Sequence, residues 1–176
     1  MPCPRSRAPR SSVLQTGIGG KITAVTYRQV EVRNVTFGER VTAVLPSNLY
    51  GCTIGDDTFI GPFVEIQAGA VIGQRCRIQS HAFICDLVII GDDCFISHGV
   101  MFINDMFKDG RRAMGDRALW QPTNIGRHVL IGTNATILPV RIADGVVVGA
   151  GSVVTGDLLV KGLYAGNPAK LIRMIE

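Results

Sequence analysis

From Ile54 onward the chain repeats a large aliphatic residue at every sixth position. The series runs without interruption through eight repeats: Ile54, Ile60, Ile66, Ile72, Ile78, Ile84, Ile90 and Ile96. A period of six fits neither the α-helical period of about 3.6 residues nor the simple alternation of a strand. It is typical of the hexapeptide repeat of a parallel β-helix, and we therefore predict that fold.

Three hexads make a coil of 18 residues, so residues 18 apart should stack on one of three faces. We expect stacks of Ile54, Ile72 and Ile90, of Ile60, Ile78 and Ile96, and of Ile66, Ile84 and Phe102. The repeat begins less regularly at Phe37, Ala43 and Leu49, and it resumes at Ile125, Ile131, Ile137, Ile142, Val148 and Val154. Each coil would hydrogen-bond to the coils on either side of it, as in other solenoids.

The period fails between residues 103 and 123, in a charged stretch that contains the single Trp of the chain. A long excursion from a strict solenoid is more often functional than accidental, and we expect a loop that projects from one corner. At the end of the chain, residues 167–176 predict a short helix, because Asn167 can cap it and Pro168 suits its first turn. The predicted β-helix domain covers residues 31–176.

The excess positive charge of the chain lies near its start. Residues 1–30 hold five Lys and Arg and no acidic residue, whereas residues 31–176 hold thirteen Lys and Arg against fourteen Asp and Glu. A nearly neutral body removes the main support for a nucleic-acid partner. We interpret residues 1–30 as a basic, disordered leader or the product of a mis-chosen start, with a transit peptide and a basic binding arm as alternatives. No apolar run approaches the roughly 18 residues of a membrane span, so we expect no membrane partner and a cytoplasmic protein.

The hexads, the excursion loop and the ending GAGSVV…AGNPAK together resemble the left-handed β-helix acyltransferases over roughly residues 37–176. The segments NLYGCTIGDDTFIGPFVEIQ, ICD and HGVMFIND resemble, more narrowly, bacterial sugar-nucleotide N-acetyltransferases. The resemblance implies an all-β, left-handed parallel β-helix, although general crossover rules favour the opposite hand. It also implies transfer of acetyl from acetyl-CoA to the amino group of a UDP- or dTDP-linked amino sugar, in surface polysaccharide biosynthesis.

Such prisms carry apolar residues on flat outer faces, which they can hide by associating around a threefold axis. We therefore expect a homotrimer. In that assembly CoA would lie in a groove between two subunits, so the sites would be shared between them.

Three residues are candidates for catalysis. His98 follows Ile96 at the second position, which should place it near a corner and pointing outward, in contact with the sugar amine or the thioester. Asn104 and Asp105 lead into the loop, where Asn104 could orient the amine or the acetyl oxygen and Asp105 could hold His98 or receive the proton. The alternatives are a surface His bonded to a carbonyl and ordinary turn chemistry of Asn and Asp. Some relatives in the resembled family have a His before a Pro at the start of this loop, and its absence here favours the sugar-nucleotide branch.

The resemblance also suggests binding residues. The late coils around Asn134, Ala150 and Gly151 would offer backbone groups to the pantetheine arm of CoA, and Lys170 and Arg173 could meet its phosphates. In the loop, Arg111, Arg112 and Arg117 could bind a diphosphate, while Trp120 could stack on a base or anchor the loop. We expect no metal, because His81 and His98 are seventeen apart, one residue short of stacking.

Other functions remain open at this point. The chain could be a hexapeptide acyltransferase with another acceptor, for O-acetylation or for a small molecule. A γ-carbonic-anhydrase-like metal protein and a non-catalytic scaffold are less favoured. The sequence does not identify the amino sugar, the nucleotide or the group that removes the proton.

Overall fold

A computed structural model describes residues 12–16, 22–26 and 30–176, the first two of these segments as backbone only. The chain divides into two units, residues 1–30 and residues 31–176. In the first unit, β1 (Ser12–Thr16) and β2 (Ile22–Thr26) pair antiparallel. The rest of the predicted leader, apart from Val30, lies outside the described residues.

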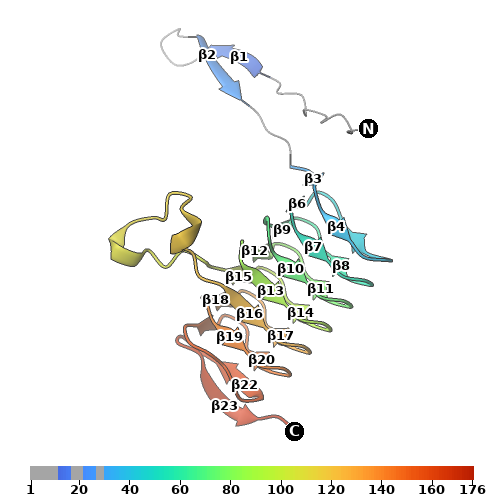
Figure 1. Cartoon of the computed structure of the whole chain (residues 1–176), viewed down its shortest axis with the longest axis vertical. Coiled ribbons are helices and arrows are strands. Elements are labelled where there is room, and N and C mark those ends of the chain that lie inside the picture. The colour runs from blue at the N-terminus through green and yellow to red at the C-terminus, as the bar shows by residue number, and fades with distance from the viewer. Residues whose placement is uncertain (1–11, 17–21, 27–29) are drawn as a thin grey trace. The chain divides into compact units, whose positions relative to one another are not determined.

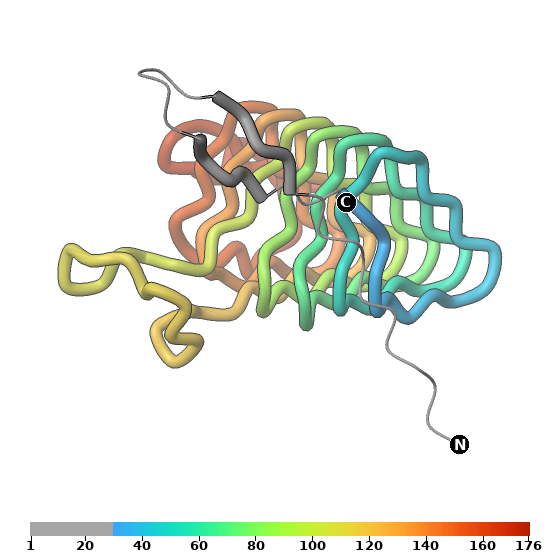
Figure 2. The backbone as a smooth tube through the Cα atoms, turned by 90° about the horizontal axis from the view of Figure 1, so that it is seen from above, coloured from blue at the N-terminus to red at the C-terminus, as the bar shows by residue number. Residues whose placement is uncertain are grey.

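Residues 31–176 form a stack of three-sided coils (Figures 1 and 2). Each side of the stack is one sheet, in which a strand pairs in parallel with the strands of the coils before and after it. The fold is the left-handed parallel β-helix that was predicted. In the part of the chain that the structure describes, no helix has the length and apolar character to cross a membrane.

The three faces take their strands in turn along the chain. The first face comprises β4 (Thr36–Phe37), β7 (Thr53–Ile54), β10 (Val71–Ile72), β13 (Val88–Ile90), β16 (Thr123–Ile125) and β19 (Arg141–Ile142). The second face comprises β5 (Thr42–Ala43), β8 (Phe59–Ile60), β11 (Arg77–Ile78), β14 (Phe95–Ile96), β17 (Leu130–Ile131), β20 (Val147–Val148), β22 (Gly162–Ala165) and β23 (Lys170–Met174). The third face comprises β3 (Val32–Arg33), β6 (Asn48–Tyr50), β9 (Glu65–Ile66), β12 (Phe83–Ile84), β15 (Met101–Phe102), β18 (Thr136–Ile137) and β21 (Val153–Val154).

The register of the strands confirms the predicted stacks. Ile54 pairs with Ile72 and Ile72 with Ile90, and the eight isoleucines of the series are each at most 1% exposed. Burying each such side chain contributes roughly 1.5–3 kcal/mol relative to leaving it in water. The stack continues after the loop, because Ile90 pairs with Ile125 and Ile125 with Ile142.

Every corner of the regular coils turns on one residue with positive φ. These residues stand three positions after each inward isoleucine: Asp57, Phe63, Gly69, Arg75, His81, Leu87, Asp93 and Gly99. Most are not glycine, although this backbone region disfavours other residues by roughly 1–2 kcal/mol. Hydrogen bonds between coils hold the turns, as where the His81 N–H donates to the Pro62 carbonyl. Position within the hexad, more than residue type, therefore sets the corner conformation.

The predicted C-terminal helix is wrong. The chain turns at residues 166–169, and β23 (Lys170–Met174) then runs antiparallel to β22 (Gly162–Ala165). Without β23, the last strand of the second face would present a row of unpaired backbone groups. Pairing with that edge overrides the local signals for a helix start at Asn167 and Pro168.

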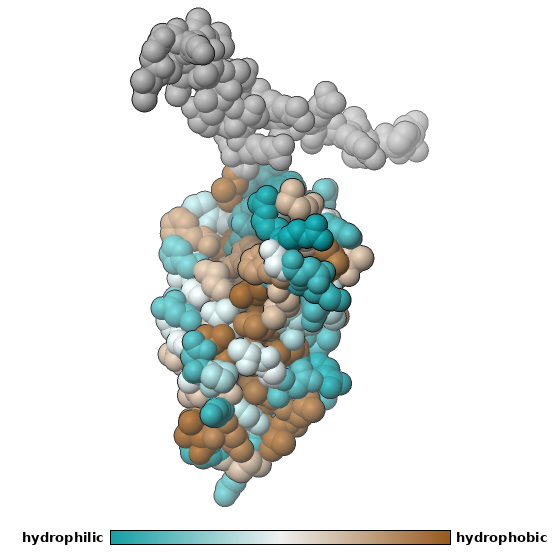
Figure 3. Space-filling model, turned by 90° about the vertical axis from the view of Figure 1, so that its left-hand side faces the viewer, coloured by the Kyte–Doolittle hydropathy of each residue, from teal (hydrophilic) through white to brown (hydrophobic). Residues whose placement is uncertain are grey.

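The excursion loop leaves the stack after β15 and returns at β16, at the corner between the third and first faces. It projects from the coils, as the yellow segment of Figure 2 shows, and contains the short 3-10 turns η1 (Lys108–Gly110) and η2 (Arg117–Leu119). Apolar surface gathers at the end of the stack that carries β23 (Figure 3), where Leu171, Ile172 and Met174 are exposed.

Candidate functional site

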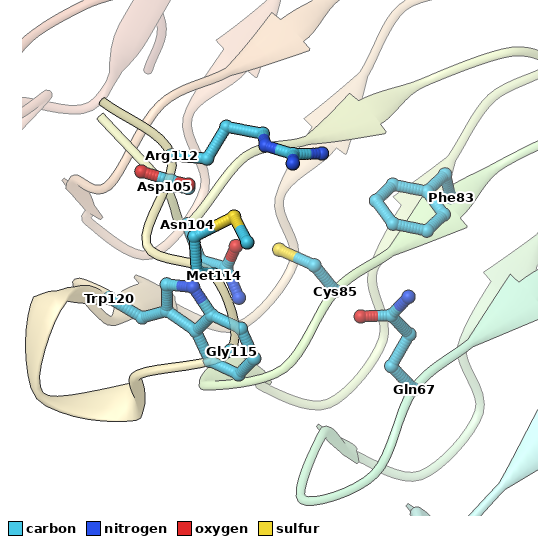
Figure 4. A pocket seen from close by; sticks show the side chains of 9 residues that line it. All are labelled: Gln67, Phe83, Cys85, Asn104, Asp105, Arg112, Met114, Gly115 and Trp120. Carbon is cyan, nitrogen blue, oxygen red and sulfur yellow. The ribbon is translucent and has the colours of Figure 1, made fainter. Parts of the chain in front are cut away.

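A pocket of about 510 Å³ lies where the loop meets the coils (Figure 4). Its lining comes from the coils (Gln67, Phe83, Cys85), from the base of the loop (Asn104, Asp105) and from the loop itself (Arg112, Met114, Gly115, Trp120). It brings together four of the residues that the sequence predicted as functional: Asn104, Asp105, Arg112 and Trp120. We call it the loop pocket.

Asn104 joins the base of the loop to the preceding coil. Its side-chain Nδ2 donates to the Asp86 carbonyl at 3.1 Å, and its own carbonyl accepts from the Gln121 N–H at 3.0 Å. Among the described residues, no donor reaches Oδ1 of Asn104. That oxygen can therefore accept a hydrogen bond from an amine in the loop pocket.

Asp105 organises the first half of the loop. Its Oδ1 accepts from the Phe107 N–H at 2.9 Å and its Oδ2 accepts from the Ala113 N–H at 2.8 Å. Each carboxylate oxygen still has a free lone pair, since a carboxylate offers about four acceptor positions. Asp105 can thus hold the loop and still accept a proton.

His98 lies at a different corner, between the second and third faces, and its side chain is exposed. Its carbonyl accepts from the Asn134 N–H at 2.9 Å, and the Gly151 N–H donates to the Thr133 carbonyl at 2.8 Å in the coils that follow. His98, Asn134, Ala150 and Gly151 therefore line one edge of the stack, which we call the histidine edge. A Cβ at Gly151 would meet no atom within 4 Å, so the backbone there is open to a ligand.

The predicted catalytic residues thus fall into two groups on either side of the third face. His98 is on the histidine edge with the predicted CoA-binding residues of the coils, whereas Asn104 and Asp105 are at the loop pocket. In the described part of the chain no hydrogen bond joins Asp105 to His98, which was one of the roles predicted for Asp105. The Nδ1 atom of His98 lies 3.5 Å from the hydroxyl of Ser97.

The predicted cationic residues differ in their surroundings. Arg111 and Arg112 are exposed on the loop, and Lys170 and Arg173 are exposed on β23. Arg117 instead forms an ion pair with the buried Asp86, at 2.9 Å, and its guanidinium lies 5.9 Å from the centre of the Trp120 ring.

Several pocket residues were not predicted from the sequence, including Gln67, Phe83, Cys85 and Met114. Two of them carried a usable signal: Gln67 and Cys85 each follow an inward isoleucine and stand 18 apart, in the two coils before the loop base. Burial raises the pKa of the Cys85 thiol to about 12. At neutral pH this thiol is therefore protonated, and Cys85 lines the pocket as an uncharged side chain and not as a nucleophile.

Within the described residues, no three His, Cys, Asp or Glu side chains gather where they could hold a metal ion. The described cysteines, Cys52, Cys76, Cys85 and Cys94, are buried and free. Cys76 and Cys94 each place Sγ 3.1 Å from a backbone carbonyl of the next coil, at Gly91 and Gly126.

Regular three-sided coils and a pocket walled by the excursion loop define the class of this protein as a parallel β-helix with a corner pocket. Residues 51–86 match the family described as bacterial transferase hexapeptide (six repeats), and residues 122–156 match the hexapeptide repeat of succinyl-transferase. The hexapeptide repeats of bacterial transferases are therefore present on both sides of the excursion loop.

The chain is also similar to curated proteins and to solved structures. The chain is 32% identical to the bifunctional protein GlmU of Thermosynechococcus vestitus over 71% of its own length and 29% of that protein. It is 38% identical to serine acetyltransferase 2 of Arabidopsis thaliana over 64% of its own length and 33% of that protein. The chain thus spans about a third or less of the curated relatives it matches.

A mutant of AntD, an N-acyltransferase from Bacillus cereus, has a similar fold and was solved in complex with dTDP and coenzyme A. The TM-score is 0.71 at 22% identity, over 80% of this chain and 84% of that one. At this identity the likeness concerns the fold.

Proposed function

We propose that this protein is an acetyl-CoA-dependent N-acetyltransferase that acts on the amino group of a nucleotide-linked amino sugar. The observation that carries the proposal is the loop pocket, which combines an amide (Asn104), a carboxylate (Asp105), a guanidinium (Arg112) and an indole (Trp120). The similar AntD fold, solved with dTDP and coenzyme A, supports the pairing of a nucleotide with an acyl-CoA.

Each pocket group suits one part of such an acceptor. The Trp120 ring offers a stacking surface for the base, an interaction worth roughly 1–3 kcal/mol. Arg112, with Arg111 beside it in the sequence, can bind the diphosphate through charge-assisted hydrogen bonds. Asn104 Oδ1 can accept from the sugar amine and so aim its lone pair.

The acetyl donor would lie along the histidine edge. There the small residues Ala150 and Gly151 allow the pantetheine arm close to the backbone, and Asn134 offers an exposed amide. Lys170 and Arg173 are exposed cations that can meet the CoA phosphates, from a strand instead of the predicted helix.

The reaction requires few groups from the protein. The amine lone pair attacks the thioester carbonyl, the tetrahedral intermediate expels CoA as its thiolate, and one proton leaves the nitrogen. Orientation of the two substrates can supply about 7–11 kcal/mol of barrier reduction, and a base adds about 10²–10⁴-fold. His98 or Asp105 would receive the proton, which can then pass to the thiolate.

The separation of the two groups of residues favours a shared site. His98 does not line the loop pocket of its own protomer. In a homotrimer, the histidine edge of one protomer would face the loop pocket of a neighbour, and donor and acceptor would meet between them. The trimer is therefore part of the proposal.

Thiol release from acetyl-CoA, measured with a panel of UDP- and dTDP-linked amino sugars and with simple amines, tests this function. We expect turnover with one nucleotide amino sugar, and a loss of roughly 10²–10³-fold in kcat/KM for Asn104→Ala, comparable to losing a transition-state hydrogen bond. Asn124→Ala, on the exposed surface of β16, is the matched control and should keep full activity. Failure of every nucleotide amino sugar as acceptor would overturn the proposal.

A second candidate is acetyl transfer to a small hydroxyl acceptor. It is favoured by the 38% identity to serine acetyltransferase 2. Turnover with free serine or with sugars that lack an amino group, and not with nucleotide amino sugars, would establish it.

A further inference from the structure

We propose that Asp86 is a positioning residue, whose ion pair with Arg117 holds the excursion loop in the shape that forms the loop pocket. The inference rests on the proposed function for its account of the acceptor site, and on geometry alone for its account of the loop. We call the pair of Asp86 and Arg117 the latch.

The geometry of the latch is that of a strong ion pair. Arg117 Nη1 lies 2.9 Å from Asp86 Oδ2, and Nη2 lies 3.0 Å from Oδ1, so the contact is bidentate. The side chain of Asp86 is only 7% exposed, whereas that of Arg117 is 59% exposed. Removing Arg117 would leave a buried carboxylate without its cation, and such a loss is far costlier than the loss of a surface pair.

The latch is also the link between the loop and the coils. Among the described residues, it is the sole ion pair or hydrogen bond that joins residues 106–120 to a coil. The other polar contacts of the loop are internal or are made at its base, where Asp105 and Asn104 accept from loop N–H groups. The orientation of the loop beyond its base therefore depends on this pair.

Asp86 holds two parts of the pocket at once. Its carboxylate binds Arg117, and its backbone carbonyl accepts from Nδ2 of Asn104 at 3.1 Å. Gly69, in the preceding coil, leaves room for the carboxylate of Asp86 because it has no side chain, and its φ is +82°. A Cβ at Gly69 would lie 2.9 Å from Asp86 Oδ1 and 3.7 Å from Arg117 Nη2.

The latch reaches the pocket through Trp120. The guanidinium of Arg117 lies 5.9 Å from the centre of the indole ring. The backbone N–H of Trp120 also donates to the Arg117 carbonyl at 3.2 Å. Asp116 stabilises the turn between them by accepting from the Ala118 N–H at 3.0 Å. Holding Arg117 thus holds the indole against the pocket.

This role differs from the diphosphate-binding role that the sequence predicted for Arg117. A guanidinium whose charge is matched by a buried carboxylate is a poor second partner for a phosphate. Arg111 and Arg112 then remain as the loop cations for the acceptor.

The single Trp of the chain makes the latch directly measurable, because intrinsic fluorescence reports on Trp120 alone. The variants are Arg117→Gln, Asp86→Asn and the double variant, with Arg127→Gln as the matched control. Arg127 also pairs with an aspartate, Asp144 at 3.3 Å, but both partners are exposed and lie at another corner. Far-UV circular dichroism establishes that each variant keeps its β-helix.

We expect Arg117→Gln and Asp86→Asn to shift the Trp120 emission to longer wavelength and to increase its quenching by acrylamide. The control should leave both unchanged. Trypsin should also cut faster after Arg111 or Arg112 in the latch variants. The double variant should be no worse than the worse single variant, because both substitutions remove the same interaction.

In the transferase assay, the latch variants should lose about 10–100-fold in kcat/KM for the acceptor, since small displacements of positioning groups cost this much. The KM for acetyl-CoA should not change. An unchanged Trp120 signal in both single variants would overturn the latch, whatever the activity. A changed Trp120 signal with unchanged acceptor kinetics would overturn the positioning role. A wild type that acetylates no nucleotide amino sugar would refute the proposed function, and the fluorescence would still decide the latch.

Discussion

Gly73→Ala tests how tightly the coils are stacked. A Cβ at Gly73 would lie 2.5 Å from Oδ1 of Asp92, 2.7 Å from the carbonyl carbon of Gly91 and 2.8 Å from the backbone nitrogen of Asp92. Two of these three atoms are backbone atoms of the next coil, so they cannot swing aside as a flexible side chain would. The added methyl group must therefore separate two coils or displace a corner.

The cost can be worked out from these contacts. Overpacking of this kind costs about 1–3 kcal/mol. The carboxylate that the methyl group would meet accepts from the Gln74 N–H at 2.9 Å. Losing that bond adds about 0.5–1.5 kcal/mol. A total of about 1.5–4.5 kcal/mol would lower the Tm by about 3–18 °C, at about 2–4 °C per kcal/mol for a protein of this size.

The assay is urea unfolding of wild type and Gly73→Ala, followed by far-UV circular dichroism. Gly156→Ala is the matched control. A Cβ at Gly156 would meet no heavy atom within 4 Å. That variant should be as stable as wild type or about 0.4–1 kcal/mol more stable, because alanine restricts the unfolded chain. A Gly73→Ala protein as stable as wild type would refute the close stacking.

Two further predictions concern chemistry. If His98 receives the proton, His98→Asn should lower kcat by about 10²–10⁴-fold, with little change in the KM for acetyl-CoA. A kcat close to that of wild type would contradict this and leave Asp105 as the proton acceptor. Burial raises the pKa of Cys52 to about 11 and that of Cys85 to about 12, from an ordinary value of 9.0, so the folded state keeps these thiols protonated where the unfolded chain ionises them. The contribution of these thiols to the free energy of unfolding should therefore be constant below about pH 9 and should fall as the pH rises toward about 12. Urea unfolding across this range should give a shallower fall for Cys85→Ala, and an identical slope would contradict the assignment.

The fold could be predicted from the sequence because a hexad repeats one simple requirement. A large aliphatic residue must point inward every six residues, and Ile54 to Ile96 meet this requirement with no exception. The pairing of Phe102 with Ile137 and of Ile90 with Ile125 shows that the register is kept across the loop.

The C-terminal segment could not be predicted in this way. Asn167 and Pro168 are local signals, whereas β23 forms because β22 needs a partner along its edge. That need arises from the tertiary structure and leaves no local mark in the sequence.

The candidate site was predicted in part. Asn104 and Asp105 could be found because they stand where the repeat breaks, and the loop pocket contains both. The latch could not, since Asp86 and Arg117 are 31 residues apart and the loop between them has no period that would predict its path. Asp86 does stand 18 residues before Asn104, so the coil spacing places those two side by side.

The most direct measurement of the central claim is the mass and alkali stability of the product formed from acetyl-CoA and the best nucleotide amino sugar. We expect one added acetyl group on the sugar nitrogen, as an amide that resists mild alkali. An alkali-labile ester, or an acetyl group found only on acceptors without an amine, would contradict it.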